Sequence, residues 1–246
     1  MSSFAVGVDL GQRHDPTAIV VVERFDASPE IHVRHVERVP LGTAYPAVVD
    51  RVSSLVRSPR LVGACSLAVD ATGVGRPVVD LFHAAGLVPL AVTITAGTSA
   101  VIAGSEHKIP KRDLVGALQV LLQTGRIKIA ARMADRAALV EEMLSFKVAI
   151  SVAARETFGA ESGAHDDLVL ALALACYGAR EAPAIAPVAG VSEPYRDEDE
   201  DDPYDWSWMR GAVRSMVASF DRPPAPLPGV SSVTPPPRRL PPYFVR

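Results

Sequence analysis

Residues 4–9, Phe4-Ala5-Val6-Gly7-Val8-Asp9, form an apolar run that ends in an aspartate. Two further apolar runs carry acids at one end: Leu67-Ala68-Val69-Asp70, and Asp166-Asp167 directly before residues 168–176. A carboxylate buried without a partner costs desolvation free energy, and carboxylates brought together repel one another. A divalent cation would satisfy such a cluster, and oxygen ligands without a Cys or His cluster indicate Mg²⁺ or Mn²⁺. We therefore predict a metal-dependent phosphoryl-transfer enzyme in which two ions clamp a phosphate.

The first two acids are each followed by a turn that contains glycine. Asp9 precedes Leu10-Gly11, where glycine lets the backbone turn sharply beside a phosphate. Asp70 precedes the glycine-rich stretch 71–75, whose backbone amides are suited to binding phosphate at a helix start. The alternative for both is a structural one, in which each aspartate only caps a turn or a helix. We expect both Asp9 and Asp70 to be metal ligands.

Two consecutive acids stand in front of the last apolar run. One of Asp166 and Asp167 is expected to bind the metal, with Asp167 favoured, while the other caps the helix or holds a second ion. His165 is either a support for that ligand, a substrate contact or an ordinary loop histidine. Gly11 and Thr72 are expected to lie directly behind the ligands.

Size and composition are those of one ordinary domain with an extension: 246 residues, of which 48% are apolar. The two cysteines, Cys65 and Cys176, lie in apolar runs and indicate reduced core residues, which predicts a cytoplasmic protein. We find no secretory signal, and the longest apolar run is far too short to span a membrane. Residues 1–180 carry 18 basic and 18 acidic side chains, so charge leaves a nucleic-acid partner open.

Apolar patterning predicts an α/β domain over residues 1–180, with a mixed sheet and helices on both faces. An antiparallel three-strand meander should come first, followed by parallel strands. The expected strands are 4–9, 17–25, 31–39, 67–70, 88–94 and a short edge strand at 126–130. The expected helices are 45–56, 77–85, 111–123, 135–146 and 166–178, with a strand or hairpin at 148–158. The strands that end at Asp9 and Asp70 should be neighbours, because an open α/β sheet places its site at such strand ends.

The second part of the chain, residues 181–246, has a different composition. It contains 13 of the 21 prolines and an acidic block, residues 197–202. We predict a largely disordered tail. One short helix is expected at 209–220 as a docking segment, with its apolar side formed by Met209, Val213, Met216, Val217 and Phe220.

A compact basic cluster, Lys108-Ile109-Pro110-Lys111-Arg112, opens one of the predicted helices. Its three cations, Lys108, Lys111 and Arg112, suit contacts to a DNA phosphate backbone. The alternative is a solvated helix start. Cations at a helix N-terminus oppose the helix dipole, which favours a functional role.

Taken together, these motifs resemble the nuclease domain of phage terminase large subunits, which has an RNase H-like (retroviral-integrase-like) fold. The matching motifs lie in the family's order between residue 4 and about residue 178: Gly7–Gly11 with Asp15–Ala18, Val69–Gly75, Ile109–Leu114 and Gly163–Leu168. The resemblance implies that Asp9, Asp70 and Asp167 or Asp166 are metal ligands. It also implies cleavage of double-stranded DNA during phage or prophage genome packaging, in the host cytoplasm.

The sequence departs from this family in one respect. The family's packaging motor has an ATPase domain before the nuclease, whereas this chain has no Gly-Lys dipeptide and therefore no Walker A loop. Either the motor is a separate polypeptide or the chain is a nuclease-only relative. The expected partners are double-stranded DNA and a separate packaging ATPase, portal or small terminase subunit, with no membrane.

Three other functions remain open from the sequence. A Holliday-junction-resolvase-like nuclease would have the same fold and metal chemistry. An actin-like or sugar-kinase-type ATP-binding protein shares the strand-Asp-Leu-Gly start, but it needs a second such turn and a Gly-Gly loop that this sequence does not convincingly offer. A non-catalytic prophage protein would dock its partners through the acidic, proline-rich tail.

Overall fold

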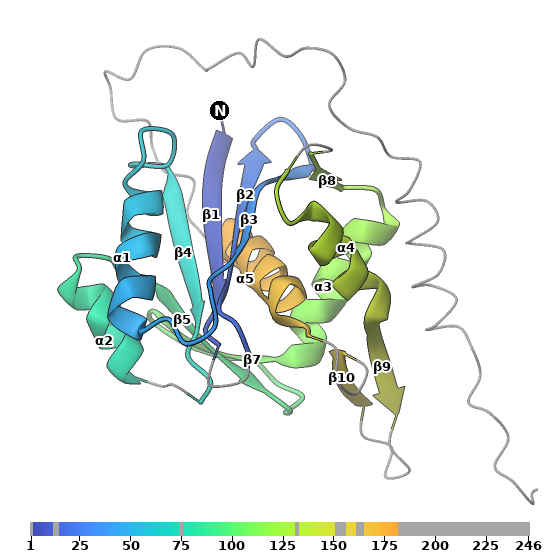
Figure 1. Ribbon diagram of the computed structural model, residues 1–246. Helices are drawn as coiled ribbons and strands as arrows, with labels where there is room; N and C mark the ends of the chain where they lie inside the picture. Colours follow the sequence, from blue (N-terminus) through green and yellow to red (C-terminus); the bar gives the residue numbers. More distant parts are fainter. Residues whose placement is uncertain are drawn as a thin grey trace, which may run out of the picture.

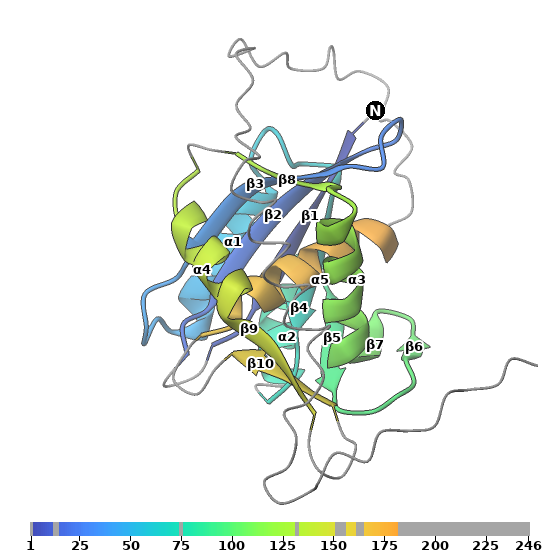
Figure 2. The ribbon, with the colours of Figure 1, turned by 90° about the vertical axis from the view of Figure 1, so that its right-hand side faces the viewer.

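The computed structural model describes residues 2–11, 15–73, 76–130, 133–150, 156–160 and 165–181. These residues form an eight-stranded mixed sheet with helices on both faces, together with a separate two-stranded hairpin (Figures 1 and 2). The predicted fold class is therefore confirmed. The tail and its expected helix at 209–220 lie outside the described residues, so the division of the chain near residue 180 stays a prediction.

The sheet has the strand order β6-β7-β5-β4-β1-β2-β3-β8. The first three strands form the expected antiparallel meander, and β4, β5 and β7 continue the sheet in parallel from β1. The strand bounds are β1 Ser2–Asp9, β2 Ala18–Phe25, β3 Ile31–Arg38, β4 Cys65–Asp70, β5 Leu90–Thr95, β6 Val101–Ala103, β7 Glu106–Pro110 and β8 Ile127–Ile129.

Helices cover the two faces of the sheet unequally (Figures 1 and 2). The first two helices lie on one face, and the other three lie on the opposite face, where the last helix crosses the middle of the sheet. Their bounds are α1 Tyr45–Val56, α2 Arg76–Ala84, α3 Lys111–Gln123, α4 Arg136–Ser145 and α5 Asp167–Glu181. Among the described residues, no helix is both long and apolar enough to cross a membrane.

Side chains of β1 point alternately to the two faces of the sheet, so this strand contributes to both hydrophobic cores. Val6 and Val8 are fully buried on the face of α1 and α2, whereas Ala5 is buried on the face of α5. Gly7 has no side chain because α5 packs directly on it: a Cβ there would lie 2.1 Å from the carbonyl oxygen of Ala171. The glycine of the opening motif therefore fixes the position of the last helix on the sheet.

The structure differs from the sequence-based prediction at a few element bounds. The strand expected from residue 88 begins at Leu90, directly after Pro89, which cannot donate a backbone hydrogen bond to a ladder. The short strands β6 and β7 were not predicted, since β7 interrupts its apolar residues with Glu106, His107 and Lys108. The strands β9 Phe146–Ile150 and β10 Glu156–Ala160 pair antiparallel, where the sequence predicts a strand or hairpin at 148–158.

Candidate metal centre

Asp9 and Asp70 end neighbouring strands at the same edge of the sheet. β1 and β4 are parallel, and Val8 lies opposite Val69 in their register, which leaves the two aspartates as the next residues on adjacent strands. Each is only 9% exposed. Their carboxyl groups are close enough to share a hydrogen bond. The prediction that the strands ending at Asp9 and Asp70 are neighbours is confirmed.

Asp167 approaches these two aspartates from α5, the helix that crosses the sheet. It is the first residue of α5, is 4% exposed, and lies close enough to Asp9 to repel its negative charge. Its Oδ2 atom is buried, and among the described residues no donor makes a hydrogen bond to it. A buried carboxylate oxygen without a donor is unstable unless it is protonated or binds a cation.

The electrostatics of the cluster favour protonation when no cation is present. Burial raises the pKa of Asp9 well above its ordinary value, and the nearby carboxylates of Asp70 and Asp167 raise that pKa further. Burial likewise raises the pKa of Asp70, and it raises the pKa of Asp167 to about 6. Asp9 thus lies near two further acids that resist ionisation, an arrangement suited to a hard divalent cation with oxygen ligands.

A second group of possible ligands also contains Asp167. Atoms of Asp15, His165 and Asp167 that are able to bind a metal all lie within 4.8 Å of one another. The Nδ1 atom of His165 is 3.9 Å from Asp15 Oδ1 and 3.7 Å from Asp167 Oδ2. Asp167 is therefore the acid that the two groups share. Asp15 was given no metal role from the sequence, although its carboxylate comes six residues after Asp9 in the same turn.

Asp166 has a different environment from Asp167. Its Oδ2 atom accepts a 2.9 Å hydrogen bond from Nζ of Lys111, the first residue of α3, and both side chains are partly exposed. Its backbone carbonyl accepts the hydrogen bond from Leu170 N–H that begins α5. Asp166 thus bridges the two helices and also raises the pKa of Asp9, whereas Asp167 is the more deeply buried of the two acids. Asp167 as the ligand stays a prediction, now with this contrast in its favour.

After β1, the backbone at Asp15 lies against Gly11. The Gly11 N–H donates a 3.1 Å hydrogen bond to Thr17 Oγ1, and the Tyr45 hydroxyl donates to the Gly11 carbonyl at 3.2 Å. A Cβ at Gly11 would lie 2.0 Å from the Asp15 carbonyl oxygen. Close backbone approach is therefore the reason for glycine at this position, in agreement with the sharp turn that the motif predicts.

Thr72 supports Asp70 from behind. Its backbone N–H donates a 2.7 Å hydrogen bond to Asp70 Oδ1, and its hydroxyl accepts a 2.7 Å hydrogen bond from the Ile94 N–H in β5. The end of β4 is thereby tied to the next strand, and one oxygen of Asp70 is held in place. The role of Thr72 behind a metal ligand stays a prediction.

An Arg–Glu pair that the sequence did not reveal holds the start of α5. Glu142 of α4, 5% exposed, accepts hydrogen bonds from the backbone N–H groups of Leu168 at 2.8 Å and Val169 at 3.2 Å. Arg38 at the end of β3 contacts the Glu142 carboxylate, and its Nε lies 3.9 Å from Asp167 Oδ2. The pair therefore satisfies the helix terminus and places a positive charge behind Asp167.

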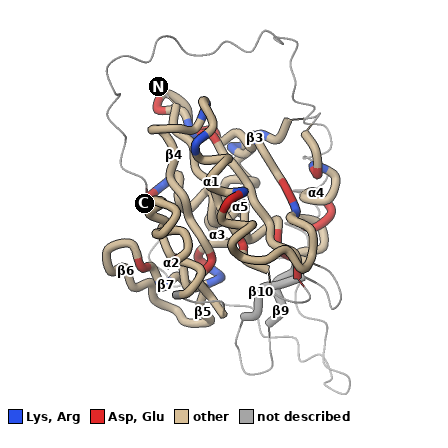
Figure 3. The backbone as a smooth tube through the Cα atoms, turned by 60° about the vertical axis from the view of Figure 1, so that its left-hand side comes forward, with Lys and Arg blue, Asp and Glu red and all other residues tan. Residues whose placement is uncertain are grey.

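The three predicted DNA contacts have separate surroundings. Lys111 binds Asp166 beside the acid cluster, whereas Lys108 is exposed in β7. Arg112 donates a 3.0 Å hydrogen bond to the Thr98 carbonyl and lies 3.3 Å from Asp113. Basic residues are spread along the chain among acidic ones (Figure 3). Their contact with DNA stays a prediction.

The fold and its acids define the class of the protein: an RNase H-like domain with carboxylates at two neighbouring strand ends and at the start of the helix that crosses the sheet. Comparison with protein families identifies one matching family. The chain belongs to the terminase RNaseH-like domain family, whose model matches residues 6–177. A comparison with curated protein sequences finds no match.

Solved structures share this fold at low sequence identity. The large terminase nuclease from thermophilic phage G20c with bound magnesium is 22% identical, with a TM-score of 0.53 over 71% of this chain and 80% of that one, and the cobalt-bound form gives the same values. The Thermus phage P74-26 large terminase nuclease domain is 20% identical, with a TM-score of 0.52 over 71% and 78%. A large terminase from another thermophilic bacteriophage is 11% identical, with a TM-score of 0.51 over 70% of this chain but 38% of that one.

Proposed function

We propose that this chain is a terminase nuclease that hydrolyses phosphodiester bonds of double-stranded DNA with Mg²⁺ or Mn²⁺. The observation that carries the proposal is the convergence of three buried acids, Asp9, Asp70 and Asp167, from two neighbouring strands and the facing helix. Membership of the terminase RNaseH-like domain family supports the same function, as do relatives solved with bound magnesium and cobalt.

We assign two cations to these residues. Asp9, Asp70 and Asp167 would hold one, because Asp9 lies near both of the other acids. Asp15, His165 and Asp167 would hold the other, because their ligand atoms all lie within 4.8 Å of one another. Bound divalent cations would supply an activated water and stabilise the leaving oxygen. The acidic residues of this chain would supply buried carboxylates that the ions neutralise. Neighbouring residues hold those carboxylates in position. Thr72 does so for Asp70, and Arg38 with Glu142 does so for Asp167.

The substrate side of the site is assigned to Lys108, Lys111 and Arg112. Lys108 lies in β7, and Lys111 and Arg112 are the first two residues of α3. Lys111 forms an ion pair with Asp166, the residue before Asp167. We assign to them contacts with DNA phosphates, which position a duplex without reading its sequence. The further partners in this proposal are a separate packaging ATPase, a portal or a small terminase subunit, with residues 1–180 as the nuclease domain and 181–246 as the tail.

Plasmid cleavage tests this function. The full chain should nick and linearise supercoiled DNA with Mn²⁺ or Mg²⁺ and should be inactive in EDTA. Asp9→Ala, Asp70→Ala and Asp167→Ala should each lower the cleavage rate by about 10²-fold or more, because the ions lose a ligand. Asp50→Ala, at an exposed acid of α1 on the other face, is the matched control and should keep full activity.

Two results would contradict the proposal. Full activity of the Asp9 or Asp70 variant would show that cleavage comes from elsewhere. Strong preference for a four-way junction over linear duplex would favour the resolvase-type nuclease instead.

A further inference from the structure

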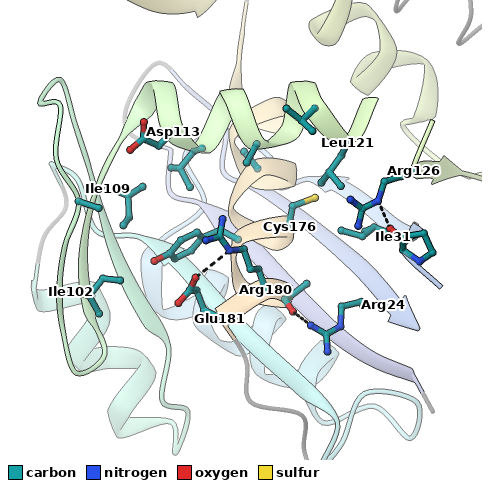
Figure 4. A pocket seen from close by; sticks show the side chains of 18 of the residues that line it. Arg24, Ile31, Ile102, Ile109, Asp113, Leu121, Arg126, Cys176, Arg180 and Glu181 are labelled. Atoms are coloured by element: carbon teal, nitrogen blue, oxygen red, sulfur yellow. Dashed lines mark hydrogen bonds and ion pairs between the residues drawn. The ribbon is translucent and has the colours of Figure 1, made fainter. Parts of the chain in front are cut away.

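A groove on the α3–α5 face of the sheet is not used by the metal centre (Figure 4). It has a volume of about 560 Å³ and lies along α3 and the C-terminal half of α5. Apolar side chains form most of its wall, among them Ile102, Ile109, Val120, Leu121 and Cys176. Ile102 is 57% exposed and Val120 is 54% exposed, so the described residues leave this wall open to solvent.

Three arginines stand around the groove, and two acids accompany them, Asp113 and Glu181. Arg24 donates a 3.0 Å hydrogen bond to the Ala179 carbonyl, and Arg126 donates one of 2.6 Å to the Pro29 carbonyl. Arg180 is 77% exposed and its Nε lies 3.7 Å from Glu181 Oε1, while Arg24 Nη2 lies 3.8 Å from Asp26 Oδ1. The groove lining carries three arginines against two acids, so its formal charge is only slightly positive. An occupant of this groove should be apolar along one side and should carry acids next to that side.

Residues 182–246 of the same chain meet this description. The chain leaves the described domain at Glu181, which itself lines the groove. Within 203–220, apolar residues recur at the three- and four-residue spacing of a helix face: Trp206, Met209, Val213, Met216, Val217 and Phe220. The acidic block 197–202 comes directly before them.

Distance does not limit this pairing. Residues 182–205 are able to span at most about 80 Å when extended, several times the length of α5, so 203–220 reaches every part of the groove. Attachment to the same chain also gives the segment an effective concentration in the millimolar range. A weak apolar contact is therefore sufficient to keep it bound.

We propose that residues 203–220 dock as an amphipathic helix in the groove between α3 and α5, with the acidic block 197–202 against the arginine rim. The docked segment covers Ile102 and Val120. This proposal goes beyond the nuclease function and does not depend on it, because the groove shares no residue with the metal centre.

The chain's two tryptophans, Trp206 and Trp208, both lie in this segment and report on it without a label. In the full chain, we expect their emission to be blue-shifted relative to urea-unfolded protein and acrylamide quenching to be weaker, because Trp206, on the apolar side of the segment, is shielded in the groove. Val120→Glu should move both readings toward the unfolded values. Val62→Glu, at an apolar side chain 61% exposed outside the groove, should change neither.

A second variant keeps the test decisive if the groove variant loses its fold by circular dichroism. Val213→Glu changes the segment alone and should expose the tryptophans to the same extent. Quenching in the wild-type chain equal to that of unfolded protein would overturn the proposal. So would quenching that falls as protein concentration rises, since the groove would then be filled by a second copy.

Discussion

The carboxylate of Glu142 accepts a 2.8 Å hydrogen bond from the backbone N–H of Leu168, the residue that follows Asp167. A side chain from one helix thus caps another helix at the point where the proposed metal ligand begins it. The same carboxylate is paired with Arg38. The position of Asp167 therefore depends on two residues that do not themselves belong to the acid cluster.

We expect Glu142→Ala to destabilise the protein by about 2–4 kcal/mol, because it leaves two buried N–H groups of α5 without an acceptor and removes the ion-pair partner of the half-buried Arg38. Chemical denaturation measures the change in the free energy of unfolding. Glu141→Ala removes the exposed neighbouring carboxylate and should have little effect. Equal stability of the two variants would show that Glu142 does not hold the helix.

Gly7→Ala should also destabilise the fold, by roughly 3 kcal/mol or more. The added Cβ would lie 2.1 Å from the Ala171 carbonyl oxygen and 2.4 Å from the Ala175 nitrogen, and both are backbone atoms that move only with α5. Asp167 would move with the helix, so cleavage should fall as well. Gly116→Ala in α3 is the control: nothing lies within 4 Å of its Cβ, and it should stabilise the helix by about 0.5–1 kcal/mol. A neutral Gly7 variant would contradict the close packing.

The stability of the metal-free protein should depend on pH through Asp167. Its pKa is raised from 3.8 to about 6, so between these values the folded state binds more protons than the unfolded state. Stability is therefore greatest at the acidic end and falls as pH rises from about 4 to about 6. Thermal unfolding in EDTA should show this decline in the wild type and a smaller one in Asp167→Asn. A rise in stability over that range in the wild type that Asp167→Asn abolishes would contradict the assignment.

Added Mg²⁺ should reverse that trend. Binding needs ionised carboxylates, so the ion should raise the melting temperature above pH 6 and have little effect below about pH 4.5. Equal stabilisation at both pH values would argue that Mg²⁺ binds at exposed acids instead.

Lys111 and Lys108 should behave differently although both were predicted to contact DNA. Lys111 bonds to Asp166, and its charge lowers the pKa of Asp70. Lys111→Met should therefore raise the pH at which Mn²⁺ binds, and calorimetry with Mn²⁺ alone measures that shift. Lys108→Met, at the exposed lysine of β7, should leave Mn²⁺ binding unchanged and reduce only the salt dependence of DNA affinity. Identical Mn²⁺ binding by both variants would remove Lys111 from the metal centre.

Sequence reasoning located Asp9 and Asp70 because their contact follows from topology: apolar runs that end in acids become neighbouring parallel strands. The contacts of Arg38 and Glu142 with the start of α5 were not predictable from the sequence, since they form only when β3 and α4 pack against that helix. Asp15 was only partly predictable. It belongs to the Asp15–Ala18 motif, but nothing in the spacing of that motif predicts that its carboxylate lies beside Asp167.

Anomalous diffraction from a Mn²⁺-soaked crystal tests the central claim most directly. We predict a manganese peak coordinated by Asp9, Asp70 and Asp167, with Asp166 still bound to Lys111. A peak only at other acids, or none at the ends of β1 and β4 at saturating Mn²⁺, would contradict the account.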